Sequence, residues 1–209
     1  SQAHYDLDLS GPMVIDIPRT DNRYYIVQLL DAYSDSIEDL HVKNVGDHGS
    51  KVLLVNKGWA GEVPEGIDRV VESRTPMVWL IQRTGVFGEQ DLNDALVIHD
   101  KFLSYPLDQL GAEHSLVELE KSTGRIPPMA RPEGLEWYSL IDRELRKNPI
   151  PEDAAIVDQF QQIGIGGSTP FNPKAISSAQ KKGLMRAIDS SQQIIQYAGR
   201  SIGDVNNGW

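Results

Sequence analysis

Three segments decide the fold of this chain: DNRYYIVQLLDAYSD (residues 21–35), KVLLVNKGWAGEVPEG (residues 51–66) and TPMVWLIQRTGV (residues 75–86). Each combines aromatic and β-branched residues, which suit a pleated and half-buried surface, with the Gly, Pro, Asp and Asn residues that form turns. The region from Asp21 to Gly85 therefore consists of short strands separated by turns.

The strand pattern extends to both sides of these segments. Residues 4–9 alternate polar and apolar side chains, Ser10-Gly11-Pro12 interrupts the alternation and residues 13–17 resume it, which predicts a hairpin. Further strands are predicted at Arg23–Tyr33, Asp39–Asn44, Lys51–Asn56, Ile67–Glu72 and Met77–Thr84. Short strands at this spacing, without helices between them, predict a mainly β fold, an antiparallel Ig-like β-sandwich, rather than a parallel βαβ sheet.

The hydrophobic period changes from two to about 3.6 after Phe87. Acidic residues in a first turn and apolar residues at helical spacing predict a helix at Gly88–Ser104 that closes the sandwich domain. We therefore expect a β-sandwich domain at residues 1–110, a proline-containing linker at residues 111–131 and a helical connector at residues 132–209. Everything after Pro127 should be helix or loop.

Two apolar stripes describe the expected connector. Trp137, Ile141 and Leu145 form the stripe of its first helix, and Pro151 begins a second helix. Asn172-Pro173 is predicted as the N-cap and first position of a long helix that reaches about Gly199. The core face of this long helix is expected to contain Leu184, Ile188, Ile195 and Ala198. We also expect Trp79 and Trp137 to be buried or nearly buried, in the sandwich core and under the connector respectively.

Composition excludes several classes of function. The chain has 209 residues, 40% of them hydrophobic, enough for one good core and a smaller one. Its net charge of -10 disfavours a nucleic-acid partner, because phosphate contacts require clustered Lys and Arg. No apolar run approaches the length of a membrane-spanning helix. The absence of Cys excludes disulfides and thiolate chemistry but leaves the compartment open.

Several motifs resemble functional sites weakly. Asp6-x-Asp8-x-Ser10-Gly11 imitates the start of a calcium loop, but Ile17 stands where the bidentate Glu is needed. Residues 163–168 have the glycines of a phosphate loop but lack its Lys, so a helix C-terminus followed by a turn is the better interpretation. The five His show no metal-binding spacing, and no Ser lies in a nucleophile-elbow pattern. We expect no metal and no cofactor.

Polar and aromatic side chains on the expected strands are the remaining candidates for a site. Rings with polar edges, an amide and an Asp–Arg pair suit a pocket for a sugar or another polar organic ligand. The alternative interpretation is structural: the rings pack in the core and rim, and Asp31 pairs with Arg83. The ligand-binding candidates are Tyr5, Gln28, Trp79 and Gln82, and the catalytic candidates are Asp31, Tyr33 and Arg83.

The segments DLDLSGPMVIDIP, DNRYYIVQLLDAYSD, KVLLVNKGWAGEVPEG, SRTPMVWLIQRTGV and ALVIHDKFLSYPL resemble the family known as domain of unknown function 1254, over about residues 1–110. The resemblance implies a sandwich truncated at its start, frequent export, and a second jelly-roll domain, domain of unknown function 1214. The ending NNGW is similar to the entrance of that domain. The chain would then be an internal fragment of a longer protein. No catalytic residue carries over from the family.

Two hypotheses follow. The first is a ligand-binding or structural module of an exported bacterial protein, periplasmic or secreted, that works with the remainder of the same protein, a small molecule or sugar, or a second copy of itself. The second is a hydrolase or isomerase with a site at the interface with the jelly-roll, where Asp31 is the acid or base, Tyr33 the proton donor and Arg83 the anchor of an anionic substrate. In either case the long helix should expose an apolar patch unless other segments cover it.

Overall fold

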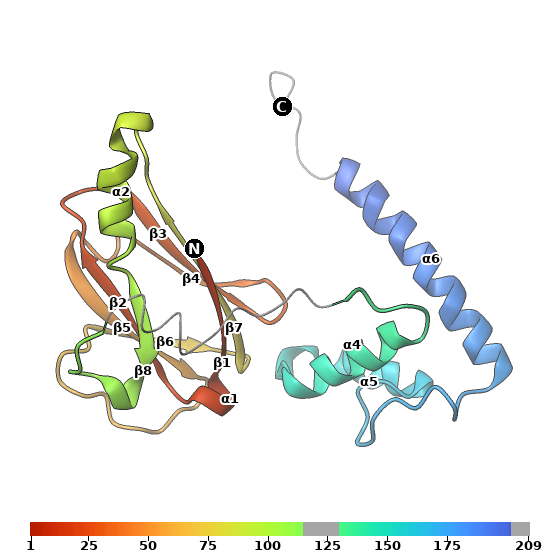
Figure 1. The fold of residues 1–209 in the computed structure, drawn as a ribbon. Coiled ribbons are helices and arrows are strands. Elements are labelled where there is room, and N and C mark those ends of the chain that lie inside the picture. The colour runs from red at the N-terminus through yellow and green to blue at the C-terminus, as the bar shows by residue number, and fades with distance from the viewer. Residues whose placement is uncertain (115–129, 202–209) are drawn as a thin grey trace. The chain divides into compact units, whose positions relative to one another are not determined.

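The computed structural model describes residues 1–114 and 130–201, and the chain forms two compact units, Ser1–Pro127 and Pro128–Trp209. The first unit contains two four-stranded sheets (Figure 1). Sheet A has the order β1 (Gln2–Asp6), β7 (Met77–Thr84), β3 (Tyr25–Asp31), β4 (Ser36–His41), and its neighbours are all antiparallel. Sheet B has the order β6 (Arg69–Ser73), β5 (His48–Asn56), β2 (Met13–Arg19), β8 (Leu103–Pro106). The predicted fold class, a β-sandwich followed by helices, is confirmed.

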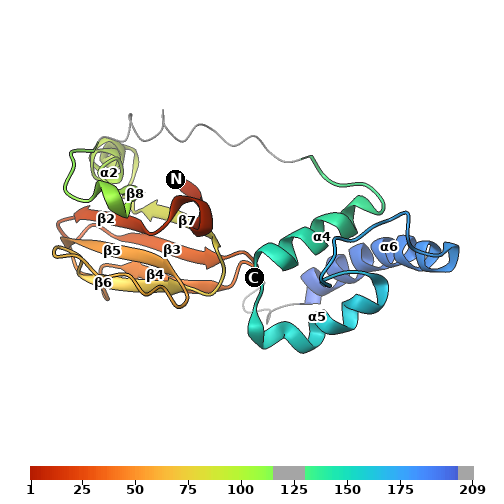
Figure 2. The same ribbon diagram turned by 90° about the horizontal axis from the view of Figure 1, so that it is seen from below.

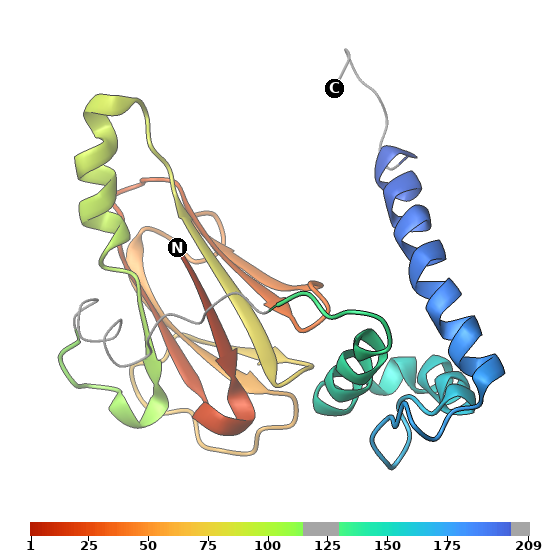
Figure 3. The same ribbon diagram turned by 45° about the vertical axis from the view of Figure 1, so that its right-hand side comes forward.

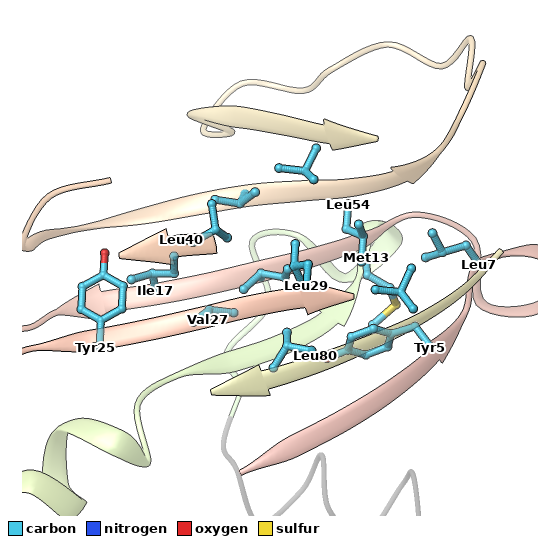
Figure 4. Close-up of a cluster of buried hydrophobic side chains, with 14 residues drawn as sticks. Tyr5, Leu7, Met13, Ile17, Tyr25, Val27, Leu29, Leu40, Leu54 and Leu80 are labelled. Atoms are coloured by element: carbon cyan, nitrogen blue, oxygen red, sulfur yellow. The ribbon is translucent and has the colours of Figure 1, made fainter. Parts of the chain in front are cut away.

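The main core lies between the two sheets. Strand alternation directs every second side chain of each sheet toward the other sheet, and these side chains are mostly Val, Leu, Ile and Tyr. Figure 4 shows Val27, Leu29 and Leu80 of sheet A together with Met13 and Leu54 of sheet B in this layer. The continuous apolar run of β5 is explained by burial of both of its faces, with Val52 and Leu54 in the main core and Leu53 and Val55 on the outer face of sheet B.

Polar contacts join the sheets at both edges of the sandwich. At one edge, the Tyr5 hydroxyl of β1 donates a hydrogen bond to the Ser104 hydroxyl of β8 over 2.6 Å. At the other edge, Arg69 of β6 forms a half-buried ion pair with Glu38 of β4 at 2.8 Å. These contacts cover strands whose outer backbone groups have no neighbour in the sheet.

The predicted hairpin at the start of the chain is wrong. β1 ends at Asp6, α1 (Leu7–Ser10) forms a single helical turn, and β2 belongs to the other sheet (Figure 2). The turn buries Leu7 and leaves Leu9 84% exposed, so the apparent alternation of residues 4–9 does not continue as a strand. Gly11 follows with a φ of 70°, a left-handed conformation that suits Gly, and redirects the chain into sheet B.

One pair of strands departs from the expected antiparallel arrangement. β5 and β6 are parallel, with Val52 opposite Arg69. Residues 57–68 connect them without a helix and contribute Trp59 and Ile67 to a second, smaller core on the outer face of sheet B. The buried members of this smaller core are Val14, Leu53, Val55 and Tyr105. A mostly exposed loop that is anchored by Trp59 and Ile67 thus takes the place of the crossover helix.

The helix predicted at Gly88–Ser104 is shorter than expected. A 3-10 turn, η1 (Glu89–Asp91), leads into α2 (Leu92–His99), and β8 begins at Leu103 and pairs with β2. A second 3-10 turn, η2 (Leu107–Gln109), follows. Tyr105, just beyond the predicted helix, is 2% exposed and belongs to the sandwich. A four-residue strand is too short to show a hydrophobic period of its own.

The second unit is helical or loop throughout residues 130–201, as predicted (Figure 3). Its elements are α4 (Glu136–Lys147), η3 (Pro151–Asp153), α5 (Ala154–Phe160), η4 (Gln161–Ile163) and α6 (Ser178–Ser201). Ile165, Phe171 and Leu184 form its core. Trp137 is only half-buried, with the Arg131 guanidinium 5.8 Å from its ring centre, so its predicted burial is wrong.

The long helix begins later than the predicted Asn172-Pro173 start. Ser177 and Gln180 form a capping box: the Gln180 amide donates to the Ser177 hydroxyl, and the Ser177 amide donates to the Gln180 side-chain oxygen. Asn172 instead accepts a hydrogen bond from the Lys174 amide in a local turn. Two candidate N-cap residues, Asn172 and Ser177, lie close together in the sequence. Ser177, which exchanges hydrogen bonds with Gln180, is the one at the helix start.

Candidate functional site on the outer face of sheet A

Sheet A has one buried face and one outward face, and the outward face gathers several of the candidate residues. Val27 and Leu29 of β3 and Val78 and Leu80 of β7 belong to the main core. Alternation therefore directs the intervening residues away from the core. These outward residues are Ile26, Gln28 and Leu30 of β3, and Met77, Trp79, Ile81 and Arg83 of β7.

Trp79 is the largest side chain on the outward face. It lies opposite His4 of β1 and Leu30 of β3, and its ring stacks on the His4 ring with centroids 5.7 Å apart and planes 8° apart. Its predicted place in the sandwich core is wrong, because its strand neighbours Val78 and Leu80 occupy the core and Trp79 is half-buried on the opposite face. The indole Nε1 is buried and has no hydrogen-bond partner among the residues that the structure describes.

Arg83 stands at the end of the same row, opposite Ile26. Its side chain is exposed, and its Nη1 donates to the Gln28 side-chain oxygen at 3.3 Å. Within residues 1–114 and 130–201, no carboxylate forms an ion pair with this guanidinium. Arg83 therefore retains most of its capacity to donate hydrogen bonds to an anion.

Asp31 is committed to the structure of its own turn. Its side chain accepts hydrogen bonds from the Tyr33 amide at 2.8 Å and the Asp35 amide at 3.0 Å, and from the Arg74 Nε at 2.6 Å. Asp31 is 3% exposed. Its partner is thus Arg74 rather than Arg83, and the predicted Asp31–Arg83 ion pair is wrong. Arg83 faces Ile26, which is five residues from Asp31 along β3, about 17 Å for an extended strand.

Hydrogen bonds around Asp31 connect the turn after β3 to the turn before β7, and this set of contacts is called the polar staple. The Ala32 amide donates to the Thr75 hydroxyl, and that hydroxyl donates to the Met77 carbonyl, so the turn after β3 is fastened to the turn before β7. The hydrogen bond from Arg74 to Asp31 is the main reason that the pKa of Arg74 is raised. Arg74 also contacts Asp35. Sequence reasoning missed Arg74, because the turns meet only in the folded sandwich.

Tyr5 and Gln82 lie on the opposite side of sheet A from Trp79. Tyr5 is part of the main core, where burial raises its pKa to about 12. Gln82 is 3% exposed, and its amide nitrogen donates to the Thr84 hydroxyl at 2.6 Å. The seven candidates therefore separate into three places: Gln28, Trp79 and Arg83 on the outward face, Tyr5 and Gln82 inside, and Asp31 with Tyr33 at the turn.

Five further residues of the outward face were not predicted as site residues: His4, Ile26, Leu30, Met77 and Ile81. The four of them on β3 and β7 could have been found by continuing the alternation of these strands from Gln28 and Trp79. His4 could not, because its position beside Trp79 depends on the pairing of β1 with β7, which are far apart in the sequence.

The sequence motifs that weakly resemble a phosphate loop and a calcium loop have structural roles. The Asp142 carboxylate, 1% exposed, accepts hydrogen bonds from the Gly166 and Phe171 amides, each at 2.9 Å. An internal carboxylate thus takes the amide donors that a phosphate would use in a phosphate loop. Gly164 ends η4 in a left-handed conformation, which confirms the predicted helix C-terminus and turn. The Asp8 side chain accepts from the Asn56 amide group at 2.9 Å.

The described parts of the chain contain neither a metal-binding cluster nor a membrane-spanning helix. No three His, Cys, Asp or Glu residues of residues 1–114 and 130–201 lie together in a way that could hold a metal ion. None of the described helices is both long and apolar enough to cross a membrane.

Comparison with known proteins gives a family and a fold. A family model described as "Protein of unknown function (DUF1254)" matches residues 1–106. The solved structure of the VPA0106 protein from Vibrio parahaemolyticus is similar, with a TM-score of 0.70 and 19% sequence identity. The similarity covers 95% of this chain and 48% of that one, so this chain spans about half the length of the Vibrio protein. No curated protein matches.

Proposed function

The chain belongs to the family of unknown function DUF1254, and on that premise we propose that it is a ligand-binding β-sandwich module whose binding surface is the outer face of sheet A. The observation that carries the proposal is the grouping of Trp79, Gln28 and Arg83 on one exposed sheet face. An aromatic ring, an amide and a guanidinium without a carboxylate partner are groups that bind organic ligands.

The chemistry of the face supports a small molecule over a purely structural role. A Trp ring that only packs in a core needs a hydrogen-bond partner for its indole N–H, and the described residues offer none to Trp79. A structural Arg on a sheet surface is commonly paired with a carboxylate, whereas Arg83 contacts an amide oxygen. The exposed Arg83 has capacity for a partner that is not part of the sandwich, and the half-buried Trp79 ring offers an apolar surface on the same face.

The alternative, a hydrolase or isomerase that uses Asp31, Tyr33 and Arg83, has less support. Catalysis by these residues requires them within reach of one substrate. The Asp31 side chain accepts two hydrogen bonds within its own turn and a third from Arg74, and the register of β3 and β7 separates it from Arg83. The ligand-binding proposal requires no role for Asp31.

A thermal-shift screen of the intact protein against sugars, fatty acids and aromatic acids tests the proposal. A ligand present at a hundred times its Kd should stabilise the protein by about 2.7 kcal/mol, which is several degrees in Tm for a chain of this size. The shift should be lost in Trp79→Leu, which keeps apolar volume but removes the ring. It should persist in Trp59→Leu, where the replaced ring lies on the outer face of sheet B. An equal loss in both variants would contradict the proposed location.

We also propose that the protein is exported and that the remainder of a longer chain is one of its partners. The support is the frequent export of the family and the 48% coverage of the Vibrio protein. Expression of the complete gene in bacteria, followed by osmotic shock, tests the location. Recovery of the protein only with the cytoplasmic fraction would contradict export.

A further inference from the structure

We propose that the ligand of the outer face of sheet A is an anionic amphiphile, a carboxylate attached to a hydrocarbon chain that lies along β7 with its head on Arg83. This inference rests on the proposed function and names the ligand class. Four observations carry it: the apolar row of β7, the cation at one end of the row, the acidic residue of β1 beside the other end, and the lack of accessible polar groups at the β7 positions between them.

The outward row along β7 is long and apolar. From Arg83, the outward residues are Ile81, Trp79 and Met77, each about 6.6 Å from the next, which gives about 20 Å in all. Ile26 and Leu30 of β3 lie beside the row, opposite Arg83 and Trp79. A narrow surface of this kind suits an extended hydrocarbon chain better than a compact polar molecule.

The charges at the two ends of the row give the ligand a direction. Arg83 contacts only the neutral Gln28 oxygen, at 3.3 Å, and a carboxylate would replace this contact with two shorter, charge-assisted hydrogen bonds. At the far end, the residue of β1 opposite Met77 is the acidic Asp6, which offers no positive charge to a carboxylate. The carboxylate therefore binds at Arg83, and the hydrocarbon chain runs toward Met77.

A sugar fits the row less well than an amphiphile. Each sugar hydroxyl that is covered by a protein surface needs a hydrogen-bond partner. Between Arg83 and Met77, the outward positions of β7 itself supply only the Trp79 indole N–H, which is buried. The polar side chains Gln28 of β3 and Gln2 and His4 of β1 lie at the flanks of the row. The remainder of the row offers hydrocarbon contacts, which favour methylene groups.

Calorimetric titration of the intact protein with dodecanoate, below its critical micelle concentration, tests the inference. Dodecanol and dodecyltrimethylammonium keep the chain but replace the carboxylate, and octanoate shortens the chain. We expect dodecanoate to bind best and each added methylene to tighten binding about two- to fourfold. Arg83→Gln should weaken dodecanoate binding about tenfold and leave dodecanol binding unchanged. Arg19→Gln, which removes an exposed Arg of sheet B, is the matched charge control and should have no effect.

The outcomes separate this inference from the proposed function. Binding of dodecanoate that is insensitive to Arg83→Gln, or equal affinity for carboxylate, alcohol and ammonium, overturns the assigned head group. Absence of dodecanoate binding, together with a sugar or aromatic acid whose thermal shift depends on Trp79, overturns the amphiphile and leaves the binding face intact. If no compound gives a shift that depends on Trp79, both proposals fail.

Discussion

At the scale of single residues, environment decided the role of each polar side chain more than residue type did. Asp31 and Arg83 were both plausible site residues from the sequence, and the structure separates them. Asp31 is buried and fully engaged with the Tyr33 and Asp35 amides and with Arg74, whereas Arg83 is exposed and contacts one amide oxygen. The residue that looked catalytic is a structural staple, and the one that looked like its partner is available to a ligand.

Asp31→Asn should therefore destabilise the intact protein by about 2 kcal/mol, because it removes a charge-assisted hydrogen bond from Arg74 in a buried environment. Asp35→Asn is the matched control. This substitution removes the contact between Arg74 and Asp35, whose side chain is 70% exposed. It should lower the free energy of unfolding by less than about 0.5 kcal/mol. Urea unfolding measures both values. Equal costs for the two variants would contradict the staple.

At the scale of elements, α2 is held on the sandwich by contacts at both of its ends. Before its first residue, Asp91 forms a bidentate ion pair with Arg23 at 2.6 Å, and hydrogen bonds from Arg23 and from the Phe87 amide hold the pKa of Asp91 at about 2. At its last residue, the His99 Nδ1 lies 3.2 Å from the Thr84 hydroxyl of β7. Burial, followed by the positive charge of the Ser1 amino group, lowers the pKa of His99 below 6.5.

The lowered pKa of His99 predicts a loss of stability in mild acid. The unfolded chain takes up a proton at His99 near pH 6.5, whereas the folded chain resists until a lower pH. The contribution of His99 to the free energy of unfolding is therefore complete above about pH 6.5. It declines as the pH falls toward and through the pKa of His99 in the folded chain. The difference between the urea midpoints at pH 7.5 and pH 5.5 should be smaller for His99→Gln than for the native protein. Identical pH dependence in the two proteins would show that His99 does not contribute.

The capping box of α6 gives a second prediction for an element. Ser177→Ala removes the hydroxyl that accepts from the Gln180 amide, and should destabilise the protein by about 1 kcal/mol. Ser178→Ala, one position inside the helix, lacks this contact and should be neutral or slightly stabilising. A helix start at Asn172, as the sequence suggested, would instead make Asn172→Ala the damaging change. Urea unfolding distinguishes the three variants.

At the scale of the whole molecule, the second unit has more apolar surface than its small core uses. Leu184 of α6 is buried in that core, but Ile194, Ile195 and Tyr197 further along the helix are 66%, 69% and 75% exposed. Exposed apolar side chains grouped on one helix mark a surface that another segment or molecule covers. This agrees with the expectation of an apolar patch on the long helix.

The exposed end of α6 should bind a hydrophobic dye when residues 1–209 are expressed alone. Ile194→Glu with Ile195→Glu should abolish most of this dye fluorescence without lowering the free energy of unfolding, because neither side chain is buried. Ile156→Glu with Met185→Glu changes two other exposed side chains of the unit as a control. Cooperative unfolding of a monomer without dye binding would mean that the patch is already covered.

The sequence by itself determined the class of fold, because the hydrophobic period is local: alternation indicates strands, and its change after Phe87 indicates helices. The alternation along β7 also puts Trp79 and Arg83, four residues apart, on one face of that strand, whereas the register of β3 and β7 decided that Gln28 lies beside them. Only the tertiary structure decided that β1 joins β7 instead of β2, that β5 and β6 are parallel, and that Asp31 pairs with Arg74. These contacts join segments far apart in the chain, and their energies depend on burial and geometry that no local pattern contains.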